Sequence, residues 1–206
     1  SMNRGLEAVS LSASRSLFNS DHLTLLGFAA MFLAGASYAL AGWHRWGLLL
    51  ATFFLAVNWL GDSLDGTLAR YRNQQRPRYG FYVDHVIDTF GAMFLMGGLA
   101  ISGYLHWWVA IGMLVAFLML SIEVYLATYT LGEFQLSHWI FGPTEIRILL
   151  AIGNVVLLYR PMVHMIGRQF RLFDVGGVMA IVAMAGMLIV SAIRHTMTLY
   201  REEPIR

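Results

Sequence analysis

The chain has 206 residues, of which 58% are hydrophobic and only 13% are charged. Soluble domains carry about a quarter charged residues, so this composition predicts an integral membrane protein. The formal net charge is only +2, which makes nucleic acid an unattractive partner, and the absence of cysteine excludes disulfides.

A helix that spans a bilayer needs about twenty predominantly apolar residues, and the chain offers six candidate segments. They run roughly over Leu23–Gly42, Trp46–Leu68, Tyr82–Ser102, Trp107–Tyr129, Thr144–Leu158 and Val175–Ile193. Before them, apolar residues recur at helical spacing, which predicts a short amphipathic helix on the membrane surface. We therefore expect an all-α membrane protein with a surface helix over 3–20, a six-helix domain over 21–200 and a cytoplasmic tail over 201–206.

The arginines predict the orientation of these helices, because cytoplasmic loops carry an excess of positive charge. With the N-terminus inside, ten of the fourteen arginines are cytoplasmic and four are outside. The loop over 160–174 departs from the rule, with three arginines on the outer side. We expect both termini to lie inside, and the lack of a targeting signal favours a prokaryotic cytoplasmic membrane.

Four of the six aspartates fall within 27 residues that join the second and third predicted spans. Their pattern is Asp62-x-x-Asp65-Gly66-x-x-Ala69-Arg70, then nine residues, then Gly80-x-x-x-Asp84-x-x-x-Asp88. Residues three or four apart share a helix face, so each helix presents a pair of carboxylates. Charge at membrane depth is costly and is usually kept for function. Four facing carboxylates would repel one another unless divalent cations bound them, and we expect two Mg²⁺ or Mn²⁺ ions.

The residues around the aspartates point to a substrate that carries phosphate. Two clustered divalent ions can neutralise phosphate charge and steady the attacking and leaving oxygens. Gly66 leaves room for a close approach of the substrate, and Arg70 can hold a phosphate with its planar fork. Gly80 lets the chain turn sharply before Asp84. The spacing therefore predicts a dimetal site for a diphosphate at the inner membrane face, and it does not name the reaction.

All eight fixed positions of this pattern resemble the signature of the CDP-alcohol phosphotransferase family. The resemblance covers essentially the whole chain and implies six membrane helices, an N-terminal surface helix and a homodimer. It also implies the reaction, in which an alcohol attacks the β-phosphate of a CDP-linked alcohol, CMP leaves and one of the two alcohols is a lipid. The residue roles that it implies are two ions bound by Asp62, Asp65, Asp84 and Asp88, a cytidine diphosphate pocket lined by Gly66, Ala69, Arg70 and Gly80, and Asp88 as general base.

A second, shorter resemblance bears on the substrate. Histidine titrates nearer neutrality than a carboxylate, which makes His85 another candidate for the base. The Asp84-His85 pair resembles the choline and ethanolamine phosphotransferase branch, where such a histidine works with a later glutamate, here Glu145. This favours CDP-choline or CDP-ethanolamine as donor and diacylglycerol as acceptor. The alternative is a CDP-diacylglycerol donor attacked by a soluble polyol, its phosphate or serine.

Other residues and other functions stay open. Glu123, in the fourth predicted span, either shapes the acceptor pocket or pairs with an arginine, and Arg147 is a candidate contact for a phosphate on the acceptor. Four intramembrane carboxylates also suit a divalent-cation transporter. Transport favours a site near the middle of the membrane that opens to both sides, whereas these aspartates flank a short inner loop. A catalytically inactive metal-binding scaffold is a third class, which the intact signature argues against.

Overall fold

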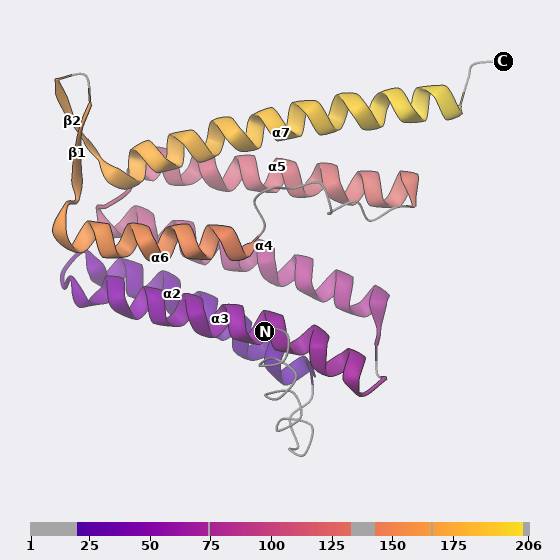
Figure 1. Ribbon diagram of the computed structural model, residues 1–206, viewed down its shortest axis with the longest axis horizontal. Coiled ribbons are helices and arrows are strands. Elements are labelled where there is room, and N and C mark those ends of the chain that lie inside the picture. The colour runs from indigo at the N-terminus through magenta and orange to yellow at the C-terminus, as the bar shows by residue number, and fades with distance from the viewer. Residues whose placement is uncertain (1–19, 74, 133–142, 166, 204–206) are drawn as a thin grey trace, which may run out of the picture.

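The computed structural model describes residues 20–73, 75–132, 143–165 and 167–203, which form helices and one short β-hairpin (Figure 1). The expected surface helix over 3–20 lies outside the described residues except for its last position. In chain order the elements are α2 Ser20–Ala41, α3 Trp46–Tyr71, α4 Pro77–Ser102, α5 Trp107–Leu131, α6 Pro143–Tyr159, β1 Met162–Met165, β2 Arg168–Arg171 and α7 Leu172–Glu202.

The helices confirm the predicted class of an all-α membrane protein. Five of the described helices are long and apolar enough to cross a membrane, and α6 adds a shorter apolar segment over Ile146–Tyr159. Each predicted span coincides with one helix, although several helices extend beyond the apolar core. The α4 helix begins at Pro77, five residues earlier than expected, because proline fits the first turn of a helix, where its missing N–H costs nothing.

The α2 helix packs against both α3 and α4 and holds them together. Glycines allow this close approach: a Cβ atom on Gly98 of α4 would overlap the carbonyl oxygen of Gly35 on α2. On the other side of α2, a Cβ on Gly61 of α3 would lie 2.9 Å from the carbonyl oxygen of Leu23. Small residues at such crossings are how membrane helices gain close packing. These contacts fix the helices that carry the two aspartate pairs.

The tightly packed core lies toward the end of the bundle away from the aspartates. Its buried apolar residues are Ala34, Tyr38, Ala41, Leu48, Ala51, Leu55, Leu95, Leu99, Leu105, Val109, Ala110 and Leu157. A polar network crosses this core, in which the Tyr38 hydroxyl donates to Asn154 Oδ1 at 2.9 Å and Asn154 Nδ2 donates to Thr52 Oγ1 at 3.0 Å. The network joins α2, α6 and α3 and anchors the end opposite the aspartates.

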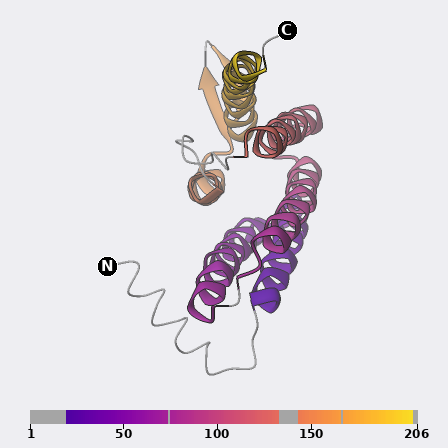
Figure 2. The same cartoon turned by 90° about the vertical axis from the view of Figure 1, so that its right-hand side faces the viewer.

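The remaining elements lie to one side of the α2–α3–α4 unit. Figure 2 shows α5 and α7 side by side, with α4 between them and the α2–α3 pair. Between α6 and α7 the chain forms an antiparallel hairpin that runs across the helix axes at the end away from the aspartates (Figure 1). The sequence analysis predicts only a loop over 160–174, without strands. The hairpin turns at Gly167, whose φ of 71° suits glycine.

Candidate functional site

The four aspartates line one small pocket near the loop that joins α3 to α4. Asp62 and Asp65 come from α3, and Asp84 and Asp88 come from α4. The floor is α2, which contributes Thr24, Gly27 and Phe28, and the lining is completed by Asn58, Ile87 and Arg147. The carboxylates of each helix share a face because they are three and four residues apart. The structure therefore brings the two pairs together, as the sequence predicts.

Asp65 is held in place by two donors. The Thr24 hydroxyl on α2 donates to Asp65 Oδ2 at 2.8 Å, and the backbone N–H of Gly66 donates to Oδ1 at 2.5 Å. These bonds orient the carboxylate and satisfy acceptors that would otherwise be costly at membrane depth. The α3–α4 loop is tied to the same end of α2, because Arg76 donates to both carboxylate oxygens of Asp21, at 2.5 and 2.7 Å.

Asp62 forms an ion pair with Arg147, the one arginine among the described residues that line the pocket. Arg147 Nη1 on α6 donates to Asp62 Oδ2 at 2.9 Å, and the arginine side chain is only 11% exposed. This ion pair links α6 to α3 across the pocket. The free volume of the pocket is about 20 Å³, which is close to the space that one water molecule needs. A phosphate group that is to contact Arg147 within this pocket needs the guanidinium to leave Asp62.

Asn58 is a site residue that the sequence analysis missed. It lies one helical turn before Asp62 and lines the same pocket, yet its side chain is only 7% exposed. Its Nδ2 donates to the Gly27 carbonyl at 2.9 Å, and since a carbonyl can only accept, this bond fixes the direction of the amide. Its buried Oδ1 has no hydrogen-bond partner within the described part of the chain. The sequence signal for Asn58 is a polar amide in an apolar helix, four residues before Asp62 and therefore on the same helix face.

The donors suit a hard divalent cation, although they are not arranged as a finished cage. Among the residues that the structure describes, no three His, Asp or Glu side chains stand close enough to hold one ion. Two of the four carboxylates are engaged elsewhere, Asp62 by Arg147 and Asp65 by Thr24 and Gly66. Mg²⁺ and Ca²⁺ take carboxylate and amide oxygens, and the Asn58 Oδ1 atom is a buried oxygen that lacks a donor. The set therefore fits such an ion once the carboxylates turn from these partners.

The residues expected at the cytidine diphosphate lie outside this small pocket. Gly66, Ala69 and Arg70 continue α3 beyond Asp65 toward the loop, and Gly80 lies one turn before Asp84 on α4. Arg70 is exposed and its Nη2 contacts Thr67 Oγ1 at 3.4 Å. These positions extend from the aspartates toward the α3–α4 loop, so their role as a nucleotide pocket stays a prediction.

His85 faces α5 and does not line the pocket. Its ring packs against Phe81 and Tyr125, with ring centroids 4.1 and 4.8 Å apart. Its Nδ1 lies 2.5 Å from the Phe81 carbonyl, which can only accept, so Nδ1 carries the proton in the neutral ring. The Nε2 atom of that tautomer is the basic one. His85 also interacts electrostatically with Asp84 and Asp88. Glu145 lies in the first turn of α6, and its side chain lies outside the described part.

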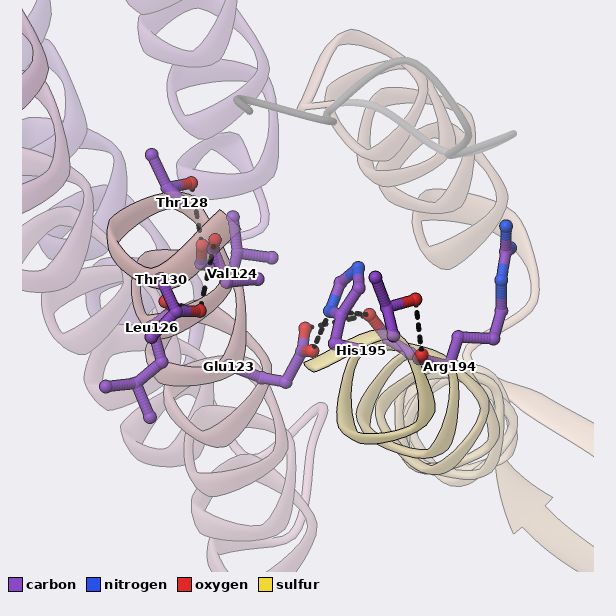
Figure 3. Close-up of polar contacts among 10 residues, drawn as sticks. Glu123, Val124, Leu126, Thr128, Thr130, Arg194 and His195 are labelled. Atoms are coloured by element: carbon purple, nitrogen blue, oxygen red, sulfur yellow. Dashed lines mark hydrogen bonds and ion pairs between the residues drawn. The ribbon is translucent and has the colours of Figure 1, made fainter. Parts of the chain in front are cut away.

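Glu123 contacts a histidine and a serine. The sequence analysis predicts instead that it pairs with an arginine or shapes the acceptor pocket. Figure 3 shows Glu123 of α5 directed toward His195 of α7. Glu123 Oε1 lies 2.6 Å from His195 Nδ1, and the Ser191 hydroxyl donates to Oε2 at 2.9 Å. Both side chains are largely buried, with 12% of Glu123 and 25% of His195 exposed. The cluster joins α5 to α7 at membrane depth.

Comparisons with known proteins identify the family of this chain. The family model described as CDP-alcohol phosphatidyltransferase matches residues 18–199, so the chain belongs to that family and the predicted membership is confirmed. Members of the family generally depend on a divalent cation. The chain is also similar to an archaetidylinositol phosphate synthase of Pyrococcus horikoshii, with 31% identity over 101 residues. That match covers 49% of this chain and 50% of the relative, so the chain spans about half the length of the relative.

Proposed function

We propose that this chain is a membrane phosphotransferase that moves a substituted phosphate from a CDP-alcohol to an acceptor alcohol and releases CMP. The observation that carries the proposal is the pocket in which α3 and α4 each present a pair of aspartates, with Arg147 opposite. Membership of the CDP-alcohol phosphatidyltransferase family supports it. A cation transporter gains less support, because the pocket is closed on one side by the packed core.

In the proposed reaction, the oxygen of the acceptor alcohol forms a bond to the β-phosphorus. The bond from that phosphorus to the bridging oxygen breaks, CMP leaves with the electron pair, and a base takes the proton of the alcohol. Asp62, Asp65, Asp84 and Asp88 would hold divalent ions, with Asn58 as a further oxygen donor. Such ions neutralise phosphate charge. Arg147 supplies a planar fork for phosphate oxygens once it releases Asp62.

For the substrates, we favour CDP-choline or CDP-ethanolamine as donor and diacylglycerol as acceptor. The support is the Asp84-His85 pair of the sequence, which resembles the choline and ethanolamine phosphotransferase branch. The Phe81 carbonyl leaves Nε2 as the basic nitrogen of the neutral ring, and the ring would have to turn from Tyr125 on α5 toward the aspartates to take a proton from an alcohol. Asp88 is the alternative base, and Glu145 is the proposed partner of His85.

The second candidate is a CDP-linked lipid donor with a soluble phosphorylated alcohol as acceptor. The name of the Pyrococcus relative, an archaetidylinositol phosphate synthase, favours this type of reaction. Arg147 suits the diphosphate of the donor in either reaction, so it does not decide between the two candidates.

CMP release by purified protein in detergent with Mg²⁺ tests the proposal. One set combines CDP-choline or CDP-ethanolamine with diacylglycerol, and the other combines CDP-diacylglycerol with inositol phosphate, glycerol phosphate or serine. Asp88→Asn is the inactive control. Release in the first set, reduced by His85→Gln, supports the favoured substrates, whereas release only in the second set moves the assignment to the second candidate. Wild-type protein no more active than Asp88→Asn in both sets would overturn the proposed function.

A further inference from the structure

A second and much larger cavity lies at the opposite end of the bundle from the aspartates. Its volume is about 540 Å³, and it opens to the surface between the end of α6, the first strand of the hairpin and the start of α7. Its apolar lining comes from Val156, Pro161, Met162, Val163 and Leu172, and its polar lining comes from Arg160 and His164. A backbone hydrogen bond of 3.0 Å from Leu172 N to the Pro161 carbonyl joins the start of α7 to the residue before the hairpin. The proposed reaction uses none of these residues.

The polar side chains of this cavity offer hydrogen-bond donors. Arg160 carries a guanidinium, which has donors only. His164 Nε2 lies 2.8 Å from Gln169 Nε2, and because an amide nitrogen can only donate, His164 Nε2 accepts. The neutral ring therefore carries its proton on Nδ1, which is a second donor. A ligand of this cavity must supply acceptors and, next to Arg160, negative charge.

The cavity lies at the level where membrane proteins meet lipid headgroups. Trp43, Trp46, Trp107 and Trp108 are at the same end of the helices and are 73%, 74%, 65% and 53% exposed. Exposed tryptophans of this kind mark the membrane–water interface. With 17 residues, α6 is roughly 25 Å long, which is shorter than the hydrocarbon core, so its end at Tyr159 does not project far beyond the interface.

The hairpin carries apolar and basic side chains on the same face. The pairing of Val163 with Phe170 and of Met165 with Arg168 places these four residues on one face, where Phe170 and Met165 are 41% and 44% exposed. The twelve residues from 160 to 171 contain three arginines and no acidic residue. The hairpin runs across the helix axes, so in a bilayer it lies along the surface (Figure 1). Apolar side chains beside a cluster of arginines fit acyl chains beside phosphates.

We propose that this cavity binds a phospholipid of the surrounding bilayer with an anionic headgroup. Arg160 and the Nδ1–H of His164 contact the phosphate, and one acyl chain lies against Val156, Met162 and Leu172. Arg168 and Arg171 add positive charge along the hairpin. The site is separate from the aspartates, and it accounts for the three arginines that depart from the positive-inside pattern in this loop.

The test is thermal unfolding of the purified protein in detergent, titrated with phosphatidylglycerol or with phosphatidylcholine of the same acyl chains, with native mass spectrometry to count retained lipids. We expect phosphatidylglycerol to raise the melting temperature and to remain bound. Arg160→Gln should raise the half-saturating concentration of phosphatidylglycerol about fivefold, since one arginine near an anionic lipid contributes about that factor to binding. Arg45→Gln removes an exposed arginine at the same end and is the matched control.

Two further arms identify the source and place of binding. Inorganic phosphate should give no shift, and Asp62→Asn should keep the phosphatidylglycerol shift because the lipid does not bind at the aspartates. The proposal is overturned by equal effects of the two lipids, by equal losses in Arg160→Gln and Arg45→Gln, by a full shift with phosphate alone, or by loss of the shift in Asp62→Asn. If Arg160→Gln does not fold, His164→Ala replaces it and is judged by the same outcomes.

Discussion

Two buried asparagines show how the same side chain can serve function in one helix and stability in another. Asn58 lines the aspartate pocket with an Oδ1 that lacks a partner in the described part of the chain. We expect Asn58→Ala to lower CMP release about ten- to a hundredfold, as loss of a residue that supports a metal or substrate site typically does. The melting temperature should change little, because the variant removes one hydrogen bond together with one unsatisfied oxygen. Steady-state kinetics and thermal unfolding measure both quantities.

Asn154 is the matched control, and it should behave in the opposite way. It is fully buried, and both ends of its amide are bonded within the packed core. Asn154→Ala leaves the Tyr38 hydroxyl without its acceptor, which costs about 1–3 kcal/mol of unfolding free energy. The KM values of the folded variant should equal those of the wild type. Full activity in Asn58→Ala, or altered KM values in Asn154→Ala, would contradict this assignment.

At the scale of the helices, the ion pair between Arg147 and Asp62 links α6 to α3 across the pocket. Arg147→Gln should raise the KM for the CDP-alcohol about tenfold or more, because a charge-assisted bond to phosphate is lost. Arg147→Lys keeps the positive charge but loses the planar fork of the guanidinium, so its KM should lie between those of the wild type and Arg147→Gln. In the absence of substrate, Mn²⁺ should bind more tightly to Arg147→Gln, since Asp62 is released, and electron paramagnetic resonance measures this binding. Arg78→Gln, an exposed arginine at the start of α4, should change neither quantity.

The α5–α7 pair depends on a charged contact at membrane depth. His195→Leu alone leaves Glu123 without its main partner, and an unpaired buried charge is strongly destabilising, by about 3–5 kcal/mol. Replacing both with leucine removes the charge and the partner together, so the double variant should be more stable than His195→Leu. Thermal unfolding of both single variants and the double variant gives the comparison. A double variant less stable than His195→Leu would show that loss of the Glu123–His195 contact does not explain the destabilisation of His195→Leu.

For the whole molecule, the sequence predicts the helices and the aspartate pairs well because both follow from helical periodicity. The apolar runs set the spans, and spacings of three and four place each pair on one face. The partners of those aspartates depend on how helices cross, which periodicity does not determine. Thr24 and Arg147 reach the pocket only because α2 and α6 pack against α3. Asn58 lies on α3, one turn before Asp62, but its contact with Gly27 depends on the same packing. The hairpin was missed because its strands are short and lack a regular alternation of apolar and polar residues.

The orientation of the molecule remains a prediction, and the chain is well suited to test it because it contains no cysteine. Gln75→Cys places a single thiol in the exposed loop next to the aspartates, and His44→Cys places one at the opposite end. The excess of arginines near the aspartates predicts that this end is cytoplasmic. In intact cells, a membrane-impermeant maleimide should therefore label His44→Cys and spare Gln75→Cys, and both should react after the cells are opened. Labelling of Gln75→Cys in intact cells would place the aspartates outside, where a substrate carrying CDP, made in the cytoplasm, could not reach them.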